Sequence, residues 1–289
     1  MNGYQYHPIT KTNNVKTSEE IEVMLKDSVG SFSNGDTIAA GTSIDAIVRK
    51  LVQVQIPPTY SAPSVSISVS SGATGGSYEE GTSVTPNLTA AFTKNDAGAL
   101  TNIVIKKNGT QVATSTTSPA THSETFTIEG TTKFSATATY AAGAVKQDNF
   151  GADYPTGSIT AGSKNSSEIT YTGYRKFFYG ADSVATAATT SANVRALANA
   201  SDKAAAAGTT FTISVTKGQT RATFAYPATV RDVNSVKYVE MGNDESKALF
   251  EKTTVAVEGA NGHTAIDYKV YSLIPAQPFP SNMTFNVTI

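Results

Sequence analysis

The chain has 289 residues, of which 16 % are charged, and its 22 Lys and Arg residues nearly balance 23 Asp and Glu residues to leave a formal net charge of −1. A net charge so close to zero argues against a general nucleic-acid binder, which gains affinity by releasing counterions from phosphates. The absence of cysteine excludes disulfides, thiolate nucleophiles and cysteine-based zinc sites. Threonine and serine, with 42 and 29 residues, favour many short strands with solvated outer faces.

Residues 1–56 are predicted to form a small N-terminal α/β anchoring unit. The alternation of Ile21, Val23 and Leu25 predicts a short strand, and Asn34-Gly35 predicts a turn because both residues tolerate positive φ. A unit of this size cannot bury a self-sufficient core, so we expect it to dock on a neighbour.

A helix is predicted between hydroxyl caps at Thr42-Ser43 and Pro57-Pro58, which must end it. Its apolar residues recur at positions i, i+3, i+4 and i+7, so they share one face of the helix. We expect this face to be the docking interface of the unit. Its residues are Ile44, Ile47, Val48 and Leu51.

The Pro-rich stretch 57–62 predicts a linker, and residues 63–155 have the pattern of an all-β domain. Serine alternates with valine or isoleucine from residue 64 to residue 71, which predicts a half-buried strand, and Asn108-Gly109 predicts a hairpin. Roughly six or seven strands at about ten-residue spacing predict an immunoglobulin-like β-sandwich without the usual disulfide.

Residues 156–289 are predicted to form a C-terminal β-rich domain with one helix. Hydroxyl residues Thr190-Ser191 and the alanine-rich run that follows predict a helix over 191–207. Residues 216–220 and Asn261-Gly262 are predicted to be turns that join the two strands of a hairpin. The predicted fold class is therefore mainly β, and we expect this last domain to oligomerise or to face outward.

The most distinctive local feature is the aromatic run YTGYRKFFYG at residues 171–180. In a single strand, this run would present aromatic rings on both faces, so we predict that it is covered on both sides. We expect it to serve the domain core and a subunit interface, and the alternative is a platform of exposed rings for glycans. The predicted interface residues are Tyr174, Arg175, Phe177, Phe178 and Tyr179.

No motif identifies a catalytic site or a cofactor. The G-x-S-x-G pattern of serine hydrolases does not occur, and His7, His122 and His263 lie far from one another in the sequence. The turn around Asn243 and Glu245 offers oxygen ligands but lacks the spaced acidic pattern of a calcium loop, so whether it holds an ion stays open. We predict no catalytic residue, no cofactor and no resident metal.

Two pairs of adjacent carboxylates, Glu19-Glu20 and Glu79-Glu80, are the nearest approach to an acid–base pair. Consecutive residues of a strand point to opposite faces, and those of a loop are solvated, so neither pair matches a glycoside hydrolase. We interpret both pairs as ordinary surface charge. The N-terminal residues also lack a signal-peptide pattern, and no apolar run approaches the length of a membrane span, so we expect synthesis in the cytoplasm and no membrane partner.

Two blocks of the sequence carry a family resemblance. VGSFSNGDTIAAGTSIDAIVRKLVQVQIPPTYSAP and YEEGTSVTPNLTAAFTKNDAGALTNIVIKKNG resemble virion proteins of tailed phages that infect Bacteroidetes, including the crAss-like group. The last third, with GYRKFFYGADS, FAYPATVRDVNSVKYVE and DYKVYSLIPAQPF, is similar to the C-terminal module of phage fibre or appendage proteins. The resemblance extends from Val29 to Ile289.

The resemblance implies a non-enzymatic virion structural protein, such as a head fibre or a capsid-surface protein. Such a protein is often a homotrimer that contacts capsid, portal or fibre proteins, and no catalytic residues come with the family. It is made in the host bacterial cytoplasm and released by lysis, which agrees with the lack of disulfides. The alternatives are a receptor- or carbohydrate-binding module of a tail or fibre tip, which would bind host glycans, and a depolymerase, which would need a cleft with paired acids.

Overall fold

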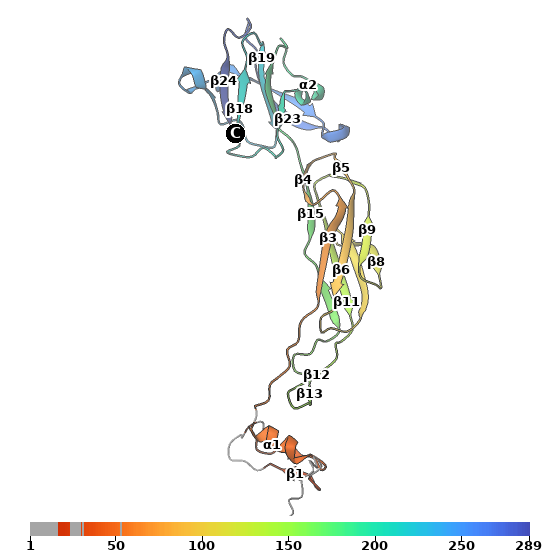
Figure 1. Ribbon diagram of the computed structural model, residues 1–289. Helices are drawn as coiled ribbons and strands as arrows, with labels where there is room; N and C mark the ends of the chain where they lie inside the picture. Colours follow the sequence, from red (N-terminus) through yellow and green to blue (C-terminus); the bar gives the residue numbers. More distant parts are fainter. Residues whose placement is uncertain (1–16, 24–29, 31, 53) are drawn as a thin grey trace, which may run out of the picture. The chain divides into compact units, whose positions relative to one another are not determined.

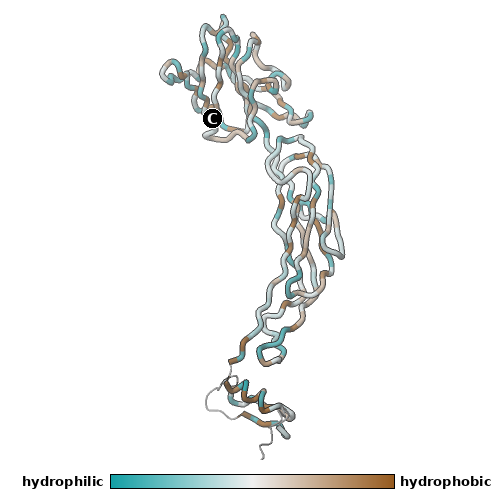
Figure 2. Tube along the Cα trace, in the orientation of Figure 1, coloured by the Kyte–Doolittle hydropathy of each residue, from teal (hydrophilic) through white to brown (hydrophobic). Residues whose placement is uncertain are grey.

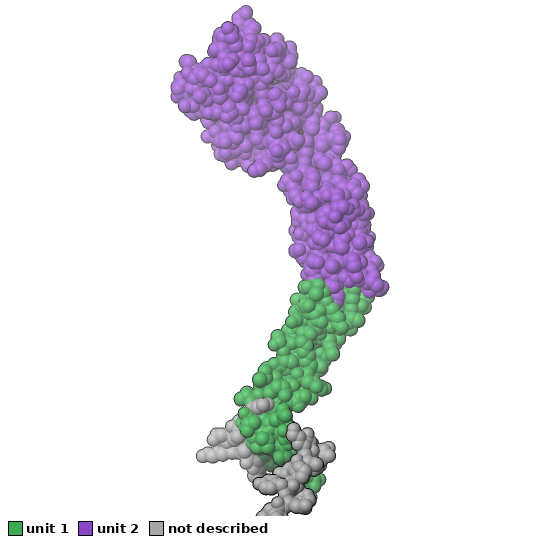
Figure 3. All heavy atoms as spheres, in the orientation of Figure 1, with its two compact units in different colours: residues 1–64, 93–101, 138–164 green, residues 65–92, 102–137, 165–289 purple. Residues whose placement is uncertain are grey.

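The computed structural model describes residues 17–23, 30, 32–52 and 54–289, and its fold is mainly β, as predicted (Figure 1). The chain divides into two compact units (Figure 3). The first unit comprises residues 1–64, 93–101 and 138–164, and the second comprises residues 65–92, 102–137 and 165–289.

The first unit contains a two-stranded antiparallel ribbon near its N-terminal end. Strand β1 (Ile21–Glu22) pairs with β2 (Thr37–Ile38). The predicted turn between them is confirmed, and Gly35 within it has a φ of 89°, a left-handed conformation that glycine adopts without steric strain. Leu25, the last residue of the predicted strand alternation, lies outside the described residues.

The predicted helix of this unit is confirmed as α1 (Ile44–Val52). The hydroxyl of Ser43 accepts a hydrogen bond from the backbone N–H of Ala46 at 3.2 Å, so it satisfies one of the free donors at the helix start. Two further short strands, β12 (Lys146–Gln147) and β13 (Asp153–Tyr154), pair antiparallel as a hairpin in the same unit.

The second unit contains most of a β-sandwich built from two sheets. One sheet has the order β3–β6–β9, and the other has the order β4–β15–β11–β7–β8, with β14 paired to β11. An immunoglobulin-like domain pairs its strands A, B and E in one sheet and G, F, C and C′ in the other, and the observed order matches this arrangement, with β4 added beside strand G. The strands are β3 (Ser64–Gly72), β4 (Gly76–Glu79), β5 (Ser83–Val84), β6 (Pro86–Thr93), β7 (Leu100–Lys107), β8 (Thr110–Ser115), β9 (Ala120–Ser123), β10 (Phe126–Thr127), β11 (Thr131–Tyr140), β14 (Gly162–Asn165) and β15 (Ile169–Tyr174).

Aliphatic and aromatic side chains fill the sandwich, and the chain contains no cysteine that could form the disulfide found in antibody domains. The ring of Phe134 lies 6.0 Å from that of Tyr171, and both side chains are fully buried. Phe126, whose ring lies 5.7 Å from that of Phe134, is only half-buried. The aliphatic side chains that are at most 1 % exposed in this core are Leu88, Ile103, Ile105 and Ile128.

The sandwich extends beyond the boundary that the sequence predicts. We expected it to end at residue 155, but β15 pairs antiparallel with β11 and parallel with β4, so the sandwich includes residues up to Tyr174. The prediction was wrong because a long excursion separates β11 from β15. This excursion contains β12, β13 and β14, which hides the ten-residue strand spacing.

The C-terminal domain consists of two sheets and one short helix. Its sheets have the orders β17–β16–β19–β23–β22 and β18–β24–β20–β21, and their side chains share one hydrophobic cluster. A second cluster lies under α2 (Ser191–Arg195), so β19 (Arg221–Pro227) is covered on both faces and buried along its whole length. The other elements are β16 (Phe178–Asp182), β17 (Asn199–Ala200), β18 (Thr210–Val215), β20 (Ser235–Tyr238), η1 (Val239–Met241), β21 (Asp244–Glu245), η2 (Lys247–Leu249), β22 (Glu251–Val257), η3 (Ala260–Gly262), β23 (Ile266–Leu273) and β24 (Met283–Thr288).

Two local predictions in this domain are wrong, and one is confirmed. The helix expected over 191–207 ends at Arg195, because β17 pairs with β16 instead of continuing the helix. Residues 216–220 do not close a hairpin, since β18 and β19 belong to different sheets. The turn at Asn261-Gly262 does connect the paired strands β22 and β23, and Asn261 has the expected positive φ of 52°.

Candidate functional site

The four predicted docking residues of α1 differ in how far their side chains are exposed. Ile44, Val48 and Leu51 are 45 %, 48 % and 41 % exposed, whereas Ile47 is half-buried. No residue of this nine-residue helix is buried. The structure therefore leaves three of the four predicted side chains uncovered, while the contact they were predicted to make stays a prediction.

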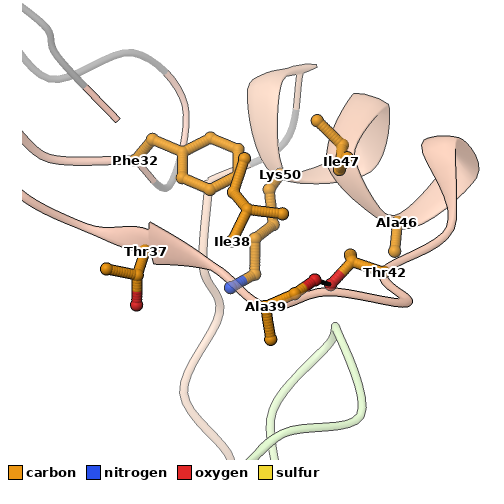
Figure 4. A pocket seen from close by; sticks show the side chains of 8 residues that line it. All are labelled: Phe32, Thr37, Ile38, Ala39, Thr42, Ala46, Ile47 and Lys50. Atoms are coloured by element: carbon orange, nitrogen blue, oxygen red, sulfur yellow. Dashed lines mark hydrogen bonds between the residues drawn. The ribbon is translucent and has the colours of Figure 1, made fainter. Parts of the chain in front are cut away.

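Ile47 faces a cavity inside the first unit (Figure 4). The cavity has a volume of about 210 Å³ and lies between α1 and the strand residues around Ile38. Phe32 is buried at its wall, and the ammonium group of Lys50 lies 5.5 Å from the centre of the Phe32 ring. One flank of α1 is thus covered by the unit itself.

The exposed apolar residues continue past the C-terminal end of the helix. Val52, Val54 and Ile56 are 73 %, 72 % and 64 % exposed. Half of the large apolar side chains that are exposed in the described residues lie between residues 44 and 56. Figure 2 shows hydrophobic positions, in brown, along α1 and the chain after it. A dense apolar patch on a surface marks an interaction site. We name Ile44, Val48, Leu51, Val52, Val54 and Ile56 the N-terminal apolar surface.

The predicted linker is held by hydrogen bonds within the first unit. The hydroxyl of Tyr60 donates to the carbonyl of Tyr154 at 2.7 Å and accepts from the backbone N–H of Lys146 at 2.6 Å. The Lys146 ammonium group donates to the carbonyl of Thr59 and to the Asp96 carboxylate, each at 2.8 Å. The stretch 57–62 therefore is not a free tether in this unit.

A second set of bonds holds the chain just before the prolines. The amide of Gln55 donates to Asp148 at 2.5 Å, and the backbone N–H of Ile56 donates to Asn149 at 2.7 Å. The Gln55 amide, with help from two backbone N–H groups, holds the pKa of Asp148 below its usual range. We call the contacts of residues 55–61 with residue 96 and the β12–β13 hairpin the linker brace.

The aromatic run at residues 171–180 belongs to two strands joined by residues 175–177, so the single strand that the sequence predicts does not form. β15 ends in the sandwich at Tyr174 and β16 begins in the C-terminal domain at Phe178. Phe177 and Phe178 are 7 % and 2 % exposed and belong to the two hydrophobic clusters of that domain, and Tyr179 is half-buried beside Phe211 with 4.7 Å between ring centres. Phe177 and Phe178 are covered by their own domain, whereas Tyr174 and Tyr179 are half-buried, and the predicted subunit interface of this run stays a prediction.

The turn after β4 brings two carboxylates against the C-terminal domain. Glu79 is only 9 % exposed and lies 2.6 Å from the guanidinium group of Arg195 and 3.5 Å from the ammonium group of Lys176. Glu80 accepts a hydrogen bond from Arg175 at 2.6 Å. The interpretation of Glu79-Glu80 as solvated surface charge is therefore wrong.

Close backbone packing accompanies these ion pairs. Gly81 has a φ of 94°, and a Cβ atom at this position would lie 2.1 Å from the carbonyl oxygen of Ala260. The side chain of Asn261 donates to the carbonyl of Gly81 at 3.0 Å, and the N–H of Ala260 donates to that of Glu80 at 2.8 Å. We call the contacts of residues 79–81 with residues 175, 176, 195 and 260–261 the charged joint.

Nothing in the sequence near Glu79 signalled this joint. Its partners, Lys176 and Arg195, follow about a hundred residues later in the chain. Ion pairs that are so distant in sequence leave no local periodicity. In the sequence, the basic residues 175–176 stand out only through their aromatic neighbours.

The described residues contain no group of three or more His, Asp or Glu side chains that could hold a metal ion. At the turn around Asn243 and Glu245, one carboxylate oxygen of Glu245 accepts hydrogen bonds from the backbone N–H groups of Val236 and Lys247. None of the helices in the described part of the chain is long and apolar enough to cross a membrane. His7 lies outside the described residues.

The arrangement thus offers an uncovered apolar surface in the first unit and a charge-paired joint in the second. The first is suited to assembly with another protein surface, and the second to holding two β domains together. Comparisons with protein-family models, with curated proteins and with solved structures found no match to this chain.

Proposed function

We propose that the chain is a non-enzymatic structural protein of a tailed-phage virion, such as a head fibre or a capsid-surface protein. The N-terminal unit attaches it to other virion proteins. The observation that carries the proposal is the N-terminal apolar surface, since six large aliphatic side chains are left at least 41 % exposed within 13 residues. Full burial of one such side chain contributes about 1.5–3 kcal/mol, so together they can hold an assembly contact.

The linker brace and the charged joint support the same proposal. A fibre must transmit force between its anchor and its outer domain, and both features replace flexible connections by hydrogen bonds and ion pairs. The Pro-rich stretch is held at Tyr60, and the sandwich is fixed to the following domain at Glu79. The resemblance to phage fibre and appendage proteins agrees with this role.

The proposal is tested on purified particles of a phage that encodes the chain. We expect mass spectrometry to find it in stoichiometric amounts, and we expect a Val48→Asp variant to be lost from the particles. Val184→Asp is the matched control, because Val184 is 46 % exposed but lies in the C-terminal domain. Absence of the wild-type chain from the particles would overturn the proposal.

A second candidate function, glycan binding, is favoured by two neighbouring hollows of the second unit. They have volumes of about 340 and 330 Å³ and share Ala204. Tyr174 and Thr229 line the first hollow, and Asp202 and Ser201 line the second. A partly exposed ring beside hydroxyl and carboxylate groups is a combination that sugars can bind.

A glycan array separates this candidate from the first. The expected result for a glycan receptor is saturable binding that is lost in Tyr174→Ala and Asp202→Ala but kept in the exposed control Glu129→Ala. Tyr179→Ala is unsuitable as a test, since Tyr179 packs against Phe177 and Phe211 and its loss would disturb the core. Equal binding by wild type and Tyr174→Ala would reject the hollows as the site.

A further inference from the structure

We propose that Asn261, in the charged joint, is a site of spontaneous deamidation, and that its conversion to aspartate opens the joint irreversibly. Asparagine followed by glycine is especially prone to this reaction, because glycine has no side chain to shield the backbone nitrogen that attacks. A second Asn-Gly dipeptide of the sequence, Asn108-Gly109, provides a matched comparison. Both sites lie outside the N-terminal apolar surface that carries the proposed function.

The two Asn-Gly turns have similar backbone conformations. The φ angles are 52° at Asn261 and 49° at Asn108, and those of the following glycines, Gly262 and Gly109, are 71° and 84°. Positive φ at both central residues is the signature of a type I′ turn. All four residues are exposed, so water reaches both sites.

The turns differ in which end of the asparagine amide they use. At Asn261, the side-chain N–H donates to the carbonyl oxygen of Gly81 at 3.0 Å. At Asn108, the side-chain oxygen accepts from the backbone N–H of Lys133 at 2.8 Å. An aspartate has two acceptor oxygens but no donor. Deamidation therefore keeps the bond at residue 108 and abolishes the bond at residue 261.

The lost bond belongs to the tightest backbone contact of the joint. The N–H of Ala260 donates to the carbonyl of Glu80 at 2.8 Å, so the Asn261 bond and this backbone bond join adjacent residues on both sides. A carboxylate at residue 261 that stays in place sets two oxygens against each other. One that turns toward solvent leaves the carbonyl of buried Gly81 without this donor. Either outcome weakens the joint.

The reaction needs no reagent except water. The backbone nitrogen of Gly262 forms a bond to the side-chain carbonyl carbon of Asn261. The bond from that carbon to the side-chain nitrogen breaks, and the nitrogen leaves as ammonia together with the proton of the Gly262 N–H. Water then opens the cyclic imide at either of its two carbonyl carbons and supplies the oxygen of the new carboxyl group. The products are aspartate and isoaspartate.

The closed joint protects Asn261 from this attack. With a φ of 52° and a ψ of 33°, the Gly262 nitrogen lies on the opposite side of the Cα–C bond from the Asn261 side chain. The turn must therefore open before the cyclic imide can form. Within the turn, the N–H of His263 donates to the carbonyl of Ala260 at 3.0 Å, which keeps it closed. Because aspartate cannot restore the donor to Gly81, an opening that ends in deamidation is not reversed.

The consequence for the joint is tested with Asn261→Asp, and Asn108→Asp is the matched control. Hydrogen exchange of the Ala260 amide measures opening of the joint, and that of the Lys133 amide measures opening at the hairpin. We expect exchange at Ala260 to become at least ~5-fold faster in Asn261→Asp, and exchange at Lys133 to be unchanged in Asn108→Asp. Asn261→Gly, which loses the donor but tolerates positive φ, is expected to speed exchange at Ala260 as well. Unchanged exchange at Ala260 in either variant would overturn the role of this donor.

The reaction itself is followed in the full wild-type chain, incubated at mildly alkaline pH in water enriched in heavy oxygen. Peptide mapping by mass spectrometry is expected to find aspartate and isoaspartate that carry heavy oxygen at residue 261. Glu79→Gln, which weakens the joint, is expected to speed deamidation of Asn261 at least ~3-fold and to leave that of Asn108 unchanged. An intact Asn261 after Asn108 has reacted would overturn the modification site. A rate at Asn261 that does not respond to Glu79→Gln would overturn its protection by the joint.

Discussion

The α1 face and the aromatic run are both predicted to be interfaces, but the fold leaves most of the first exposed and buries most of the second. On α1, Val48 is 48 % exposed, whereas in the aromatic run Phe178 is 2 % exposed. The aromatic run is followed by more than a hundred residues that build two sheets and a helix around it. The two-stranded ribbon beside α1 is small, and it covers only one flank of that helix.

The difference shows that apolar character indicates a surface that is buried by other atoms. It does not indicate whether those atoms belong to the same chain or to another molecule. The size of the surrounding domain decides this question, because a small unit cannot surround its own helix with side chains. Where the cover comes from the same chain, removing an apolar side chain should destabilise the fold. Where the cover comes from another molecule, removal should change assembly and leave folding almost unaffected.

The largest expected effect is that of Phe178→Ala. This ring packs in the cluster under α2, with the Arg195 guanidinium group 5.4 Å from its centre, so its removal leaves a cavity. We expect a loss of about 3–5 kcal/mol in the free energy of unfolding, or a drop of about 10 °C in Tm. Urea unfolding followed by tyrosine fluorescence measures it, with Val184→Ala as the exposed control. A loss as small as that of the control would contradict the core assignment.

Glu79→Gln is expected to have the next largest effect. It keeps the shape of the side chain but removes the charge that pairs with Arg195 and Lys176. These two partners are almost a third exposed, so solvent screens part of the interaction, and we expect a loss of about 2 kcal/mol. Glu129→Gln, on the exposed surface, should change stability by less than about 0.5 kcal/mol. Equal stability of Glu79→Gln and the control would show that the charged joint contributes nothing.

Tyr60→Phe tests the linker brace with a smaller expected effect. The substitution removes one hydroxyl group, which leaves the N–H of Lys146 and the carbonyl of Tyr154 without this partner. We expect a loss of about 1 kcal/mol, which corresponds to roughly five-fold faster hydrogen exchange at the Lys146 amide. Unchanged exchange at this amide would mean that the brace opens independently of Tyr60.

Acid should weaken the same brace without any substitution. Hydrogen bonds from Lys146 and Gln55 hold the pKa values of Asp96 and Asp148 below their usual range. A carboxyl group whose pKa is lower in the folded state than in the unfolded state stabilises the folded state at pH values above its unfolded pKa of about 3.9. This stabilisation is lost as the pH falls through the lower pKa of the folded state. Near neutral pH, the frequency of the opening that exposes the Ile56 amide to exchange should therefore not depend on pH. In acid, this opening should become more frequent. Asp148→Asn should remove part of this pH dependence.

Local patterns predicted most elements but not their partners. Alternation located β3, the Asn108-Gly109 dipeptide located the hairpin of β7 and β8, and the i, i+3, i+4 spacing located α1. These features depend on residues close in sequence. The sandwich boundary and the joint at Glu79 depend on partners that lie far apart in the sequence, for which one sequence contains no signal. The helix prediction for the alanine-rich run at residues 191–207 was also wrong, because the pairing of β17 with β16 outweighs helix propensity.

Val48→Thr should have the smallest effect on folding, and for that reason it is the sharpest test of the contrast between the two sets of residues. Threonine keeps the shape of valine and replaces a methyl group by a hydroxyl, which water can solvate at an exposed site. In dilute protein, hydrogen exchange of the α1 amides should report a change below about 0.5 kcal/mol. The matched control is Val194→Thr in α2, which is fully buried and should lose about 1–3 kcal/mol for its buried hydroxyl. A similar loss of unfolding free energy in Val48→Thr would mean that residues of its own unit bury Val48. The α1 face would then be buried by its own chain, like the aromatic run.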